Sequence, residues 1–229
     1  PASRASPSTS TSSRRIGQRF YRIREMERRP TSHERRARQP WDASYANGPA
    51  PWDIGRPQPA IVRLADEGAF AGTVLDAGCG TGENALHIAA LGSSVVGVDV
   101  AETALSIARE KAAARGLEAE FLAADALHLN RLARTFDTVL DCGLFHTFDA
   151  EERDAYVASL AAVTRPGARV YVLCFSTDGP GPHGPHPIGE DEVRAAFAGW
   201  NVAAIERDRI ETRFDPRGLP AWLARIERC

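Results

Sequence analysis

The chain has 229 residues, enough for one sizeable domain with its own core, and its 43% hydrophobic and 25% charged residues are typical of a soluble globular protein. No stretch of 18 apolar residues occurs, so the sequence predicts no membrane-spanning helix. The net charge of −2 is unevenly distributed: residues 1–40 hold 11 arginines and three glutamates, a charge of +8, and residues 41–229 carry −10.

The four cysteines show no C-x-x-C spacing and are far apart in the sequence, which argues against a disulfide framework or a zinc site. We therefore expect reduced thiols, a cytoplasmic location and no bound metal. The cysteines are Cys79, Cys142, Cys174 and Cys229.

Residues 1–40 form a basic head that we expect to be disordered, because it is rich in Ser, Thr, Pro and Arg with little apolar periodicity. Three interpretations compete. The head could bind nucleic acid or another polyanion, it could be a targeting segment, or the native chain could start at Met26, its only methionine. We favour the last interpretation, in which residues 1–25 are upstream or added sequence. A mass of the native protein that includes them would contradict it.

Residues 41–59 differ in character, because three aromatic side chains lie among glycines and prolines: Trp41, Tyr45 and Trp52. Trp41 and Tyr45 are four residues apart, so one turn of helix would place both on one face. Linkers seldom expose so much apolar area. We expect this segment to be an aromatic cover that packs on a ligand or on the body of the protein.

Residues 60–229 read as strands that alternate with amphipathic helices. Such alternation predicts an α/β fold: a Rossmann-like, seven-stranded, mostly parallel sheet with helices on both faces, as a single domain with the N-terminal cover. Asp149, with Glu152 three residues later, indicates a helix N-terminus. We expect strands at residues 73–79, 94–100, 119–124, 136–142, 168–175, 202–210 and 222–227, the last two antiparallel at one edge, and helices at residues 58–70, 83–91, 101–115, 151–163 and 190–198.

The glycine-rich segment DAGCGTG follows the first strand and begins with Asp76, Gly78 and Gly80. Glycines allow a tight turn and a close approach of a ligand to the backbone. Asp99 lies 19 residues after Gly80, next to Val100 at the end of the second strand. A carboxylate at this distance accepts hydrogen bonds from a ribose diol. The segment therefore predicts a nucleotide-type site.

Asp76 favours S-adenosylmethionine over a dinucleotide as the ligand. Its carboxylate would repel a pyrophosphate, whereas it would attract the ammonium and sulfonium groups of S-adenosylmethionine. The spacing also departs from G-x-G-x-x-G, because position 83 is Glu.

Two further strand ends supply candidate residues. Asp125 and Ala126 follow the third strand, where an acid could bind the adenine amine, although Asp125 could instead cap a helix. Asp141 ends the fourth strand and would reach the methionine portion of the cofactor. His146 follows it and is the candidate general base for a hydroxyl acceptor; alternatively it caps a helix or packs against the cofactor.

The segments LDAGCGTGEN, GVDV and FDTVLDCGLFH resemble the successive motifs of class I S-adenosylmethionine-dependent methyltransferases. The stretches WDASYANG and PWDIGRPQP are similar to the N-terminal cover of the thiopurine- and thiol-methyltransferase-like group. They also resemble the actinobacterial methyltransferases of heterocyclic toxins such as quinolones. The resemblance extends from residue 41 to the end of the chain, and it implies that Trp41 and Tyr45 help to enclose the cofactor.

The leading hypothesis is therefore methyl transfer from S-adenosylmethionine to an O, N or S nucleophile of a small, mostly apolar acceptor, a class that includes heterocycles. Two alternatives remain. The basic head could serve a nucleic-acid methyltransferase, although the acidic body would repel phosphates and no NPPY-like motif follows the fourth strand. The chain could also bind the cofactor without catalysis.

Overall fold

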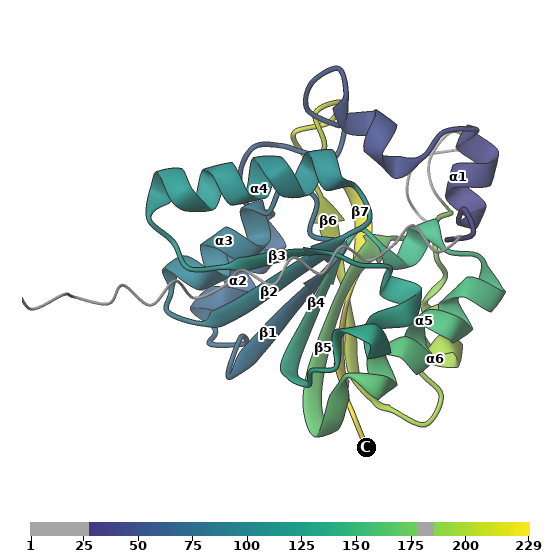
Figure 1. The fold of residues 1–229 in the computed structure, drawn as a ribbon. Helices are drawn as coiled ribbons and strands as arrows, with labels where there is room; N and C mark the ends of the chain where they lie inside the picture. The colour runs from purple at the N-terminus through teal and green to yellow at the C-terminus, as the bar shows by residue number, and fades with distance from the viewer. Residues whose placement is uncertain (1–27, 178–185) are drawn as a thin grey trace, which may run out of the picture.

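The computed structural model describes residues 28–177 and 186–229. They form a seven-stranded sheet in the order β3-β2-β1-β4-β5-β7-β6, covered by helices on both faces (Figure 1). The first five strands are parallel, whereas β7 is antiparallel to both β5 and β6. The strands are β1 (Thr73–Ala77), β2 (Ser94–Asp99), β3 (Glu120–Ala123), β4 (Phe136–Cys142), β5 (Thr164–Phe175), β6 (Asn201–Ile210) and β7 (Leu219–Glu227).

Two helical layers bury the apolar side chains of the sheet. One core contains side chains of α2, α3 and α4 with β1, β2 and β5, and the other contains side chains of η2, α5 and α6 with β4, β5 and β7. The helices of these layers are α2 (Pro59–Asp66), α3 (Glu83–Ala90), α4 (Glu102–Arg115), η2 (Ala126–Leu132), η3 (Phe145–Thr147), α5 (Ala150–Ala162) and α6 (Glu190–Ala196).

The structure confirms the predicted fold class, the seven strands and the antiparallel edge. It also confirms the α5 terminus, where Asp149 and Glu152 form a capping box. Element ends differ by a few residues. The largest differences are four residues: α2 ends at Asp66 rather than at residue 70, and β5 begins at Thr164 rather than at residue 168, because Phe136 of β4 pairs with Thr164 before a register shift.

Strand order reverses between β1 and β4, since β2 and β3 continue to one side and β5 to the other. In open α/β sheets a ligand crevice forms at the carboxyl ends of the strands at such a point. The glycine loop after β1, the end of β2 and the end of β4 all meet there.

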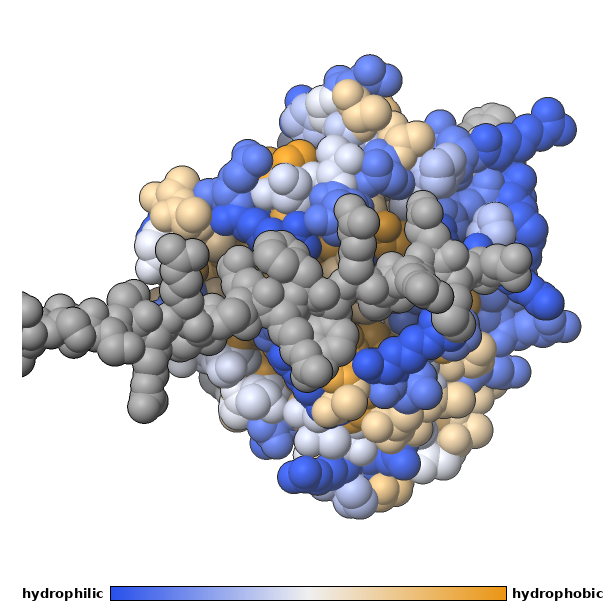
Figure 2. Space-filling model, in the orientation of Figure 1, coloured by the Kyte–Doolittle hydropathy of each residue, from blue (hydrophilic) through white to orange (hydrophobic). Residues whose placement is uncertain are grey.

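The N-terminal part of the described chain corrects one expectation. Residues 28–40 belong to the head that was predicted to be disordered, yet they contain helix α1 (Ser32–Ala37), followed by η1 (Trp41–Tyr45). The face shown in Figure 2 is hydrophilic over α1. Polar contacts rather than apolar periodicity therefore hold this helix, which is why the composition suggested disorder. The rest of that prediction, for residues 1–27, lies outside the described residues.

No helix among the described residues is long and apolar enough to cross a membrane.

Candidate functional site

A cavity of about 990 Å³ lies at the carboxyl ends of β1, β2, β4 and β5, beneath the cover formed by α1, η1 and the loop that follows them. Its wall combines the glycine loop, the strand ends, the cover and the loop between β6 and β7. Of the predicted site residues it includes Trp41, Tyr45, Trp52, Gly78, Gly80, Asp99, Val100, Asp125, Ala126 and His146. Ten residues predicted from separate sequence motifs therefore share one cavity.

The glycine loop is built for close approach. Gly78 and Gly80 have φ angles of 73° and 52°, in the left-handed region that glycine adopts without strain. A Cβ atom on Gly78 would lie 3.1 Å from Leu144 Cβ, and one on Gly80 would lie 3.2 Å from Tyr45 Oη. The loop is thus approached by the segment after β4 and by the cover, and a side chain at either glycine would crowd them.

Asp99 is fixed at one end of this loop. Its Oδ2 accepts a hydrogen bond of 2.9 Å from Gly80 N, and its Oδ1 accepts one of 2.9 Å from Ala101 N. Burial raises the pKa of the carboxyl, and these backbone donors oppose that rise. No ion pair with Asp99 forms within the described residues. Each oxygen has a further lone pair with which to accept a ligand hydroxyl.

At the far end of the cavity, Asp125 caps η2, because its Oδ1 accepts a hydrogen bond of 3.0 Å from Leu127 N. Its Oδ2 lies 3.3 Å from His128 Nδ1. The side chain still lines the cavity beside Ala126. The capping role and the ligand-facing position, weighed as alternatives from the sequence, are therefore compatible.

Asp76 and Asp141 are placed differently, because both are almost fully buried and neither forms part of the cavity wall. Burial raises the pKa of each carboxyl to about 7. Asp141 Oδ1 accepts from Leu144 N and Phe145 N at 3.0 and 3.1 Å. Within the described residues, the Oδ2 atoms of both aspartates have no hydrogen-bond partner. Their direct contact with a cofactor remains a prediction.

The aromatic cover is an ordered group. Trp52 Nε1 donates a hydrogen bond of 2.9 Å to Tyr45 Oη, and the Trp41 ring meets the Trp52 ring edge-on at 5.6 Å. Asp42, within η1, accepts from Thr103 N at 2.7 Å, which attaches the cover to the start of α4. Trp41 and Tyr45 lie on a 3-10 helix, which does not align residues four apart, but both side chains line the cavity.

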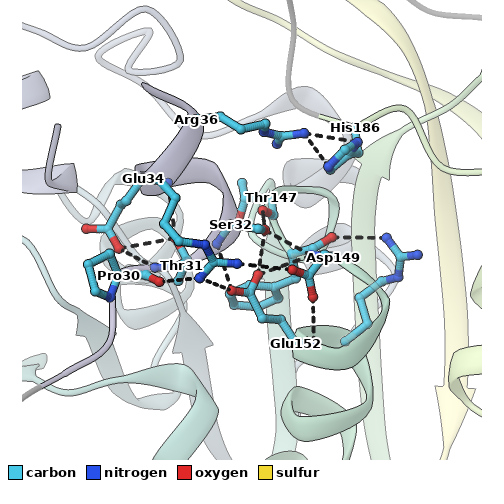
Figure 3. Close-up of polar contacts among 12 residues, drawn as sticks. Pro30, Thr31, Ser32, Glu34, Arg36, Thr147, Asp149, Glu152 and His186 are labelled. Atoms are coloured by element: carbon cyan, nitrogen blue, oxygen red, sulfur yellow. Dashed lines mark hydrogen bonds and ion pairs between the residues drawn. The ribbon is translucent and has the colours of Figure 1, made fainter. Parts of the chain in front are cut away.

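Helix α1 lies across the N-terminus of α5 (Figure 3). Ser32 donates to the Glu152 carboxylate twice, from its backbone N at 2.7 Å and from Oγ at 2.6 Å. Asp149 N in turn donates to Ser32 Oγ at 3.1 Å. Glu34, paired with Arg28, accepts from Trp41 N at 3.1 Å and thereby connects α1 to η1. The capping box of α5 is therefore also the attachment point of the cover.

His146 is buried in the cavity wall, with its ring 4.5 Å from that of Phe175. Burial lowers its pKa to about 3, so the ring is neutral. Phe175 N donates to His146 Nδ1 at 3.2 Å. A neutral imidazole that accepts at Nδ1 carries its proton on Nε2. His146 can therefore donate a hydrogen bond from Nε2 to a ligand, but it has no free lone pair there to take a proton.

Sequence reasoning missed much of the cavity wall, including two polar residues of α1, His33 and Arg36. The available signal was Thr31 with Glu34 three residues later, which is the spacing of a capping box and is one in the structure.

The cavity thus has an acidic end, an aromatic roof and a region lined by histidine and apolar side chains, an arrangement suited to an apolar ligand that carries positive charge.

A family model described as "Methyltransferase domain" matches residues 74–167. The 2-heptyl-1-hydroxyquinolin-4(1H)-one methyltransferase of Mycobacteroides abscessus is 39% identical over 169 residues, covering 72% of this chain and 74% of that protein. Thiocyanate methyltransferase 1 of Arabidopsis thaliana is 29% identical over 190 residues, covering 80% and 83%.

Several solved structures are also similar to this chain. A structure from work on the conversion of a disulfide bond into a thioacetal group during echinomycin biosynthesis has a TM-score of 0.75 and 41% identity, covering 82% of this chain and 89% of that chain. The magnesium protoporphyrin IX methyltransferase of Synechocystis PCC 6803, solved with bound S-adenosylmethionine, has a TM-score of 0.57 and 25% identity, covering 73% and 76%.

Proposed function

The chain belongs to the S-adenosylmethionine-dependent methyltransferases that act on small molecules, and we propose that its acceptor is a mostly apolar heterocycle methylated at O, N or S. The observation that carries this proposal is the covered cavity, with a volume in the range of small-molecule sites. Its relatives include methyltransferases named for two small acceptors, a heptyl-hydroxyquinolone and thiocyanate, and the first of these is an apolar heterocycle.

The cavity fits the cofactor at the end that contains Asp99. This carboxylate has backbone donors but no ion-pair partner within the described residues, so it is available to the ribose hydroxyls. Gly78 and Gly80 would leave room for the backbone to contact the methionine portion, and Asp125 with Ala126 would hold the adenine. Trp41, Tyr45 and Trp52 would lie over the cofactor, where aromatic faces attract a sulfonium. S-adenosylmethionine supplies the methyl group.

The acceptor would bind in the remaining part of the cavity, where apolar side chains dominate the wall. One of these apolar side chains is Phe175, at the end of β5. Another comes from the cover, and three come from the segment between the end of β6 and the start of β7: Ile54, Ile210, Phe214 and Leu219. Such a wall favours a flat, apolar acceptor over a sugar or a phosphate.

The protein contributes alignment and exclusion of water more than acid–base chemistry, because the thioether that leaves is neutral. The cover excludes solvent, the glycine loop and Asp99 would fix the cofactor, and His146 can donate from Nε2 to an acceptor heteroatom. We also propose a reducing, cytoplasmic setting, in keeping with four cysteines that are all free.

Calorimetry and a methyl-transfer panel test the proposal. We expect S-adenosylmethionine and S-adenosylhomocysteine to bind, and turnover with at least one of 1-hydroxyquinolin-4(1H)-one, thiophenol and benzimidazole, but not with tRNA. A protein that binds the cofactor but methylates only tRNA would overturn the small-acceptor proposal and support the nucleic-acid alternative. Cofactor binding without turnover of any acceptor would instead favour a non-catalytic role.

A further inference from the structure

Helix α1 brings a second histidine to the cavity. His33 lines the wall, and its ring stacks on Trp41 at a centroid distance of 4.4 Å with an interplanar angle of 6°. The stacking fixes the plane of the imidazole. Within the part of the chain that the structure describes, neither ring nitrogen of His33 makes a hydrogen bond, and Nδ1 is buried without a partner. This imidazole is therefore held in place without having its lone pair or its N–H committed to the protein.

His33 and His146 differ in what they can do, although both line the cavity. The amide of Phe175 occupies Nδ1 of His146, so that ring can only donate to a ligand. The neutral ring of His33 retains a lone pair on one nitrogen. Of these two histidines, His33 is the one that can accept a proton.

The surroundings of His33 keep it neutral near pH 7. Burial lowers its pKa, and so do the charge of Arg36 on the same helix and the nearby His186; Glu34 acts in the opposite direction. Arg36 itself contacts His186 (Figure 3). His146, on η3, also lies close enough to interact electrostatically with His33, and it is neutral. The ring is therefore in its basic form, but it is a weaker base than an ordinary histidine.

We propose that His33 is a catalytic residue that removes the proton from an acidic O–H or S–H group of the acceptor during methyl transfer. The inference rests on the proposed function and narrows it. A weak base removes a proton efficiently only from a fairly acidic group. The acceptors are then thiols, N-hydroxy heterocycles and acidic phenols rather than aliphatic alcohols or amines.

The acceptor is X–H, where X is oxygen or sulfur. The X–H bond breaks and its proton passes to Nε2 of His33, the ring nitrogen that is not buried, while its electron pair forms the X–C bond to the methyl group. The C–S bond of the cofactor breaks and its electron pair stays on sulfur, which becomes a neutral thioether. His33 is only half-buried, so it can return the proton to solvent.

His33→Gln tests the role with acceptors of graded acidity at pH 7.5. A suitable thiol series runs from 4-nitrothiophenol, which is already ionised, through thiophenol to phenylmethanethiol, which is protonated; nitrophenol and phenol serve for hydroxyl acceptors. We expect kcat to fall by roughly 10² or more for the protonated acceptors, the typical loss of a general base. For the ionised acceptor we expect kcat to change by less than about threefold, because no proton has to be removed.

An equal fall in kcat across the series would overturn the proposal, because it would indicate a structural effect. Turnover only of acceptors that have no acidic proton would also overturn it. The matched control is His87→Gln, a histidine of α3 outside the cavity wall, which should leave the series unchanged. Cofactor affinity measured by calorimetry shows that each variant folds. Wild-type turnover tests the proposed function separately from the role of His33.

Arg36→Gln gives a second, independent readout. Removing this positive charge should raise the pKa of His33, so the acidic limb of the kcat/KM profile should move to higher pH. Arg38→Gln, an exposed arginine at the end of the same helix, should leave the limb in place. In His33→Gln the limb should move to the pKa of the acceptor itself, because only the ionised acceptor then reacts. An unmoved limb in either the Arg36 or the His33 variant would contradict the assignment.

Discussion

At the scale of single residues, Asp99 carries the clearest expectation for cofactor binding. In Asp99→Asn the side-chain amide can accept from only one of the two backbone donors, Gly80 N and Ala101 N, and its NH₂ group would face the other. Hydrogen bonds to a charged group contribute about 1.5–3 kcal/mol. We expect the Kd for S-adenosylmethionine to rise about tenfold or more, measured by calorimetry. Asp154→Asn, an exposed change on α5, is the control, and equal affinities for the two variants would remove Asp99 from the site.

Asp141 makes stability depend on pH in an unusual direction. Its pKa is raised from 3.8 to about 7 by burial, so between these values the folded state keeps a proton that the unfolded state releases. The free energy of unfolding therefore falls as the pH rises from about 4 to about 7, by about 1.4 kcal/mol per pH unit for this one carboxyl. Above about pH 7 the contribution of Asp141 no longer changes with pH. Below pH 4 both states are protonated and the penalty disappears.

Asp141→Asn should remove this penalty while keeping an oxygen for Leu144 N and Phe145 N. We expect the variant to be more stable than the parent at pH 8 in urea unfolding, with a difference that shrinks toward pH 4. A variant that is less stable at pH 8 would show that the carboxylate has a compensating partner. Asp76→Asn is less suitable, because the pKa of Asp76 is raised by the neighbouring Asp141 and Asp99 carboxyls as well as by burial.

At the scale of elements, α1 depends on a few polar contacts with α5. Ser32→Ala removes the hydroxyl that bridges Glu152 and Asp149. We expect the free energy with which α1 docks on α5 to become less favourable by about 1–3 kcal/mol. The helix should then open more often, which makes the peptide bonds after the exposed Arg35, Arg36 and Arg38 accessible to trypsin. We expect cleavage in α1 to accelerate roughly tenfold or more, with little change in Tm.

The control for this prediction is Ser93→Ala, which also removes one side-chain hydrogen bond, to Phe70 O, but far from the cover. It should leave cleavage in α1 unchanged. Equal rates for Ser32→Ala and the parent would mean that other contacts seat the helix.

Elements were predictable where local pattern and tertiary structure agree. The α5 terminus followed from Asp149 and Glu152 alone, since a capping box is a local motif. The strands followed from apolar runs between turn residues. The start of α1 has the same local motif, Thr31 with Glu34, and it was overlooked. The docking of α1 could not be predicted, because its contacts with Glu152 join residues 120 positions apart. The role of His146 escaped for the same reason: the amide of Phe175 decides which nitrogen is free.

At the scale of the whole molecule, the last part of the basic head contributes to the cavity wall through Arg28 and through His33 and Arg36 of α1. We expect removal of residues 1–25 to leave cofactor affinity and acceptor turnover unchanged within about twofold. Removal of residues 1–40 should retain the sheet, seen by circular dichroism, but lose most acceptor turnover together with α1. Loss of activity on the shorter deletion would show that the basic head takes part in function.

The global arrangement was predictable from strand order and motif, but the closing of the cavity was not. Arg213 N donates to Pro51 O at 2.8 Å, and the Gln58 side chain exchanges hydrogen bonds with the backbone of Glu211. These contacts attach the cover to the loop between β6 and β7. Nothing in the local sequence of either segment specifies the other, so the enclosed volume follows only from the complete fold.

The contact between the cover and the loop that joins β6 to β7 has a consequence for biosynthesis. The cover leaves the ribosome before any strand of the sheet, yet its partners at Glu211 and Arg213 are made more than 150 residues later. Because chains emerge from the N-terminus, Tyr45 can pack on Ala101 and Ala104 of α4 early, but the end of the cover around Pro51 and Gln58 must wait until β6 and β7 have emerged. A nascent chain arrested before β6 should therefore be unable to retain the cofactor, and the cover is the segment on which a chaperone has the longest time to act.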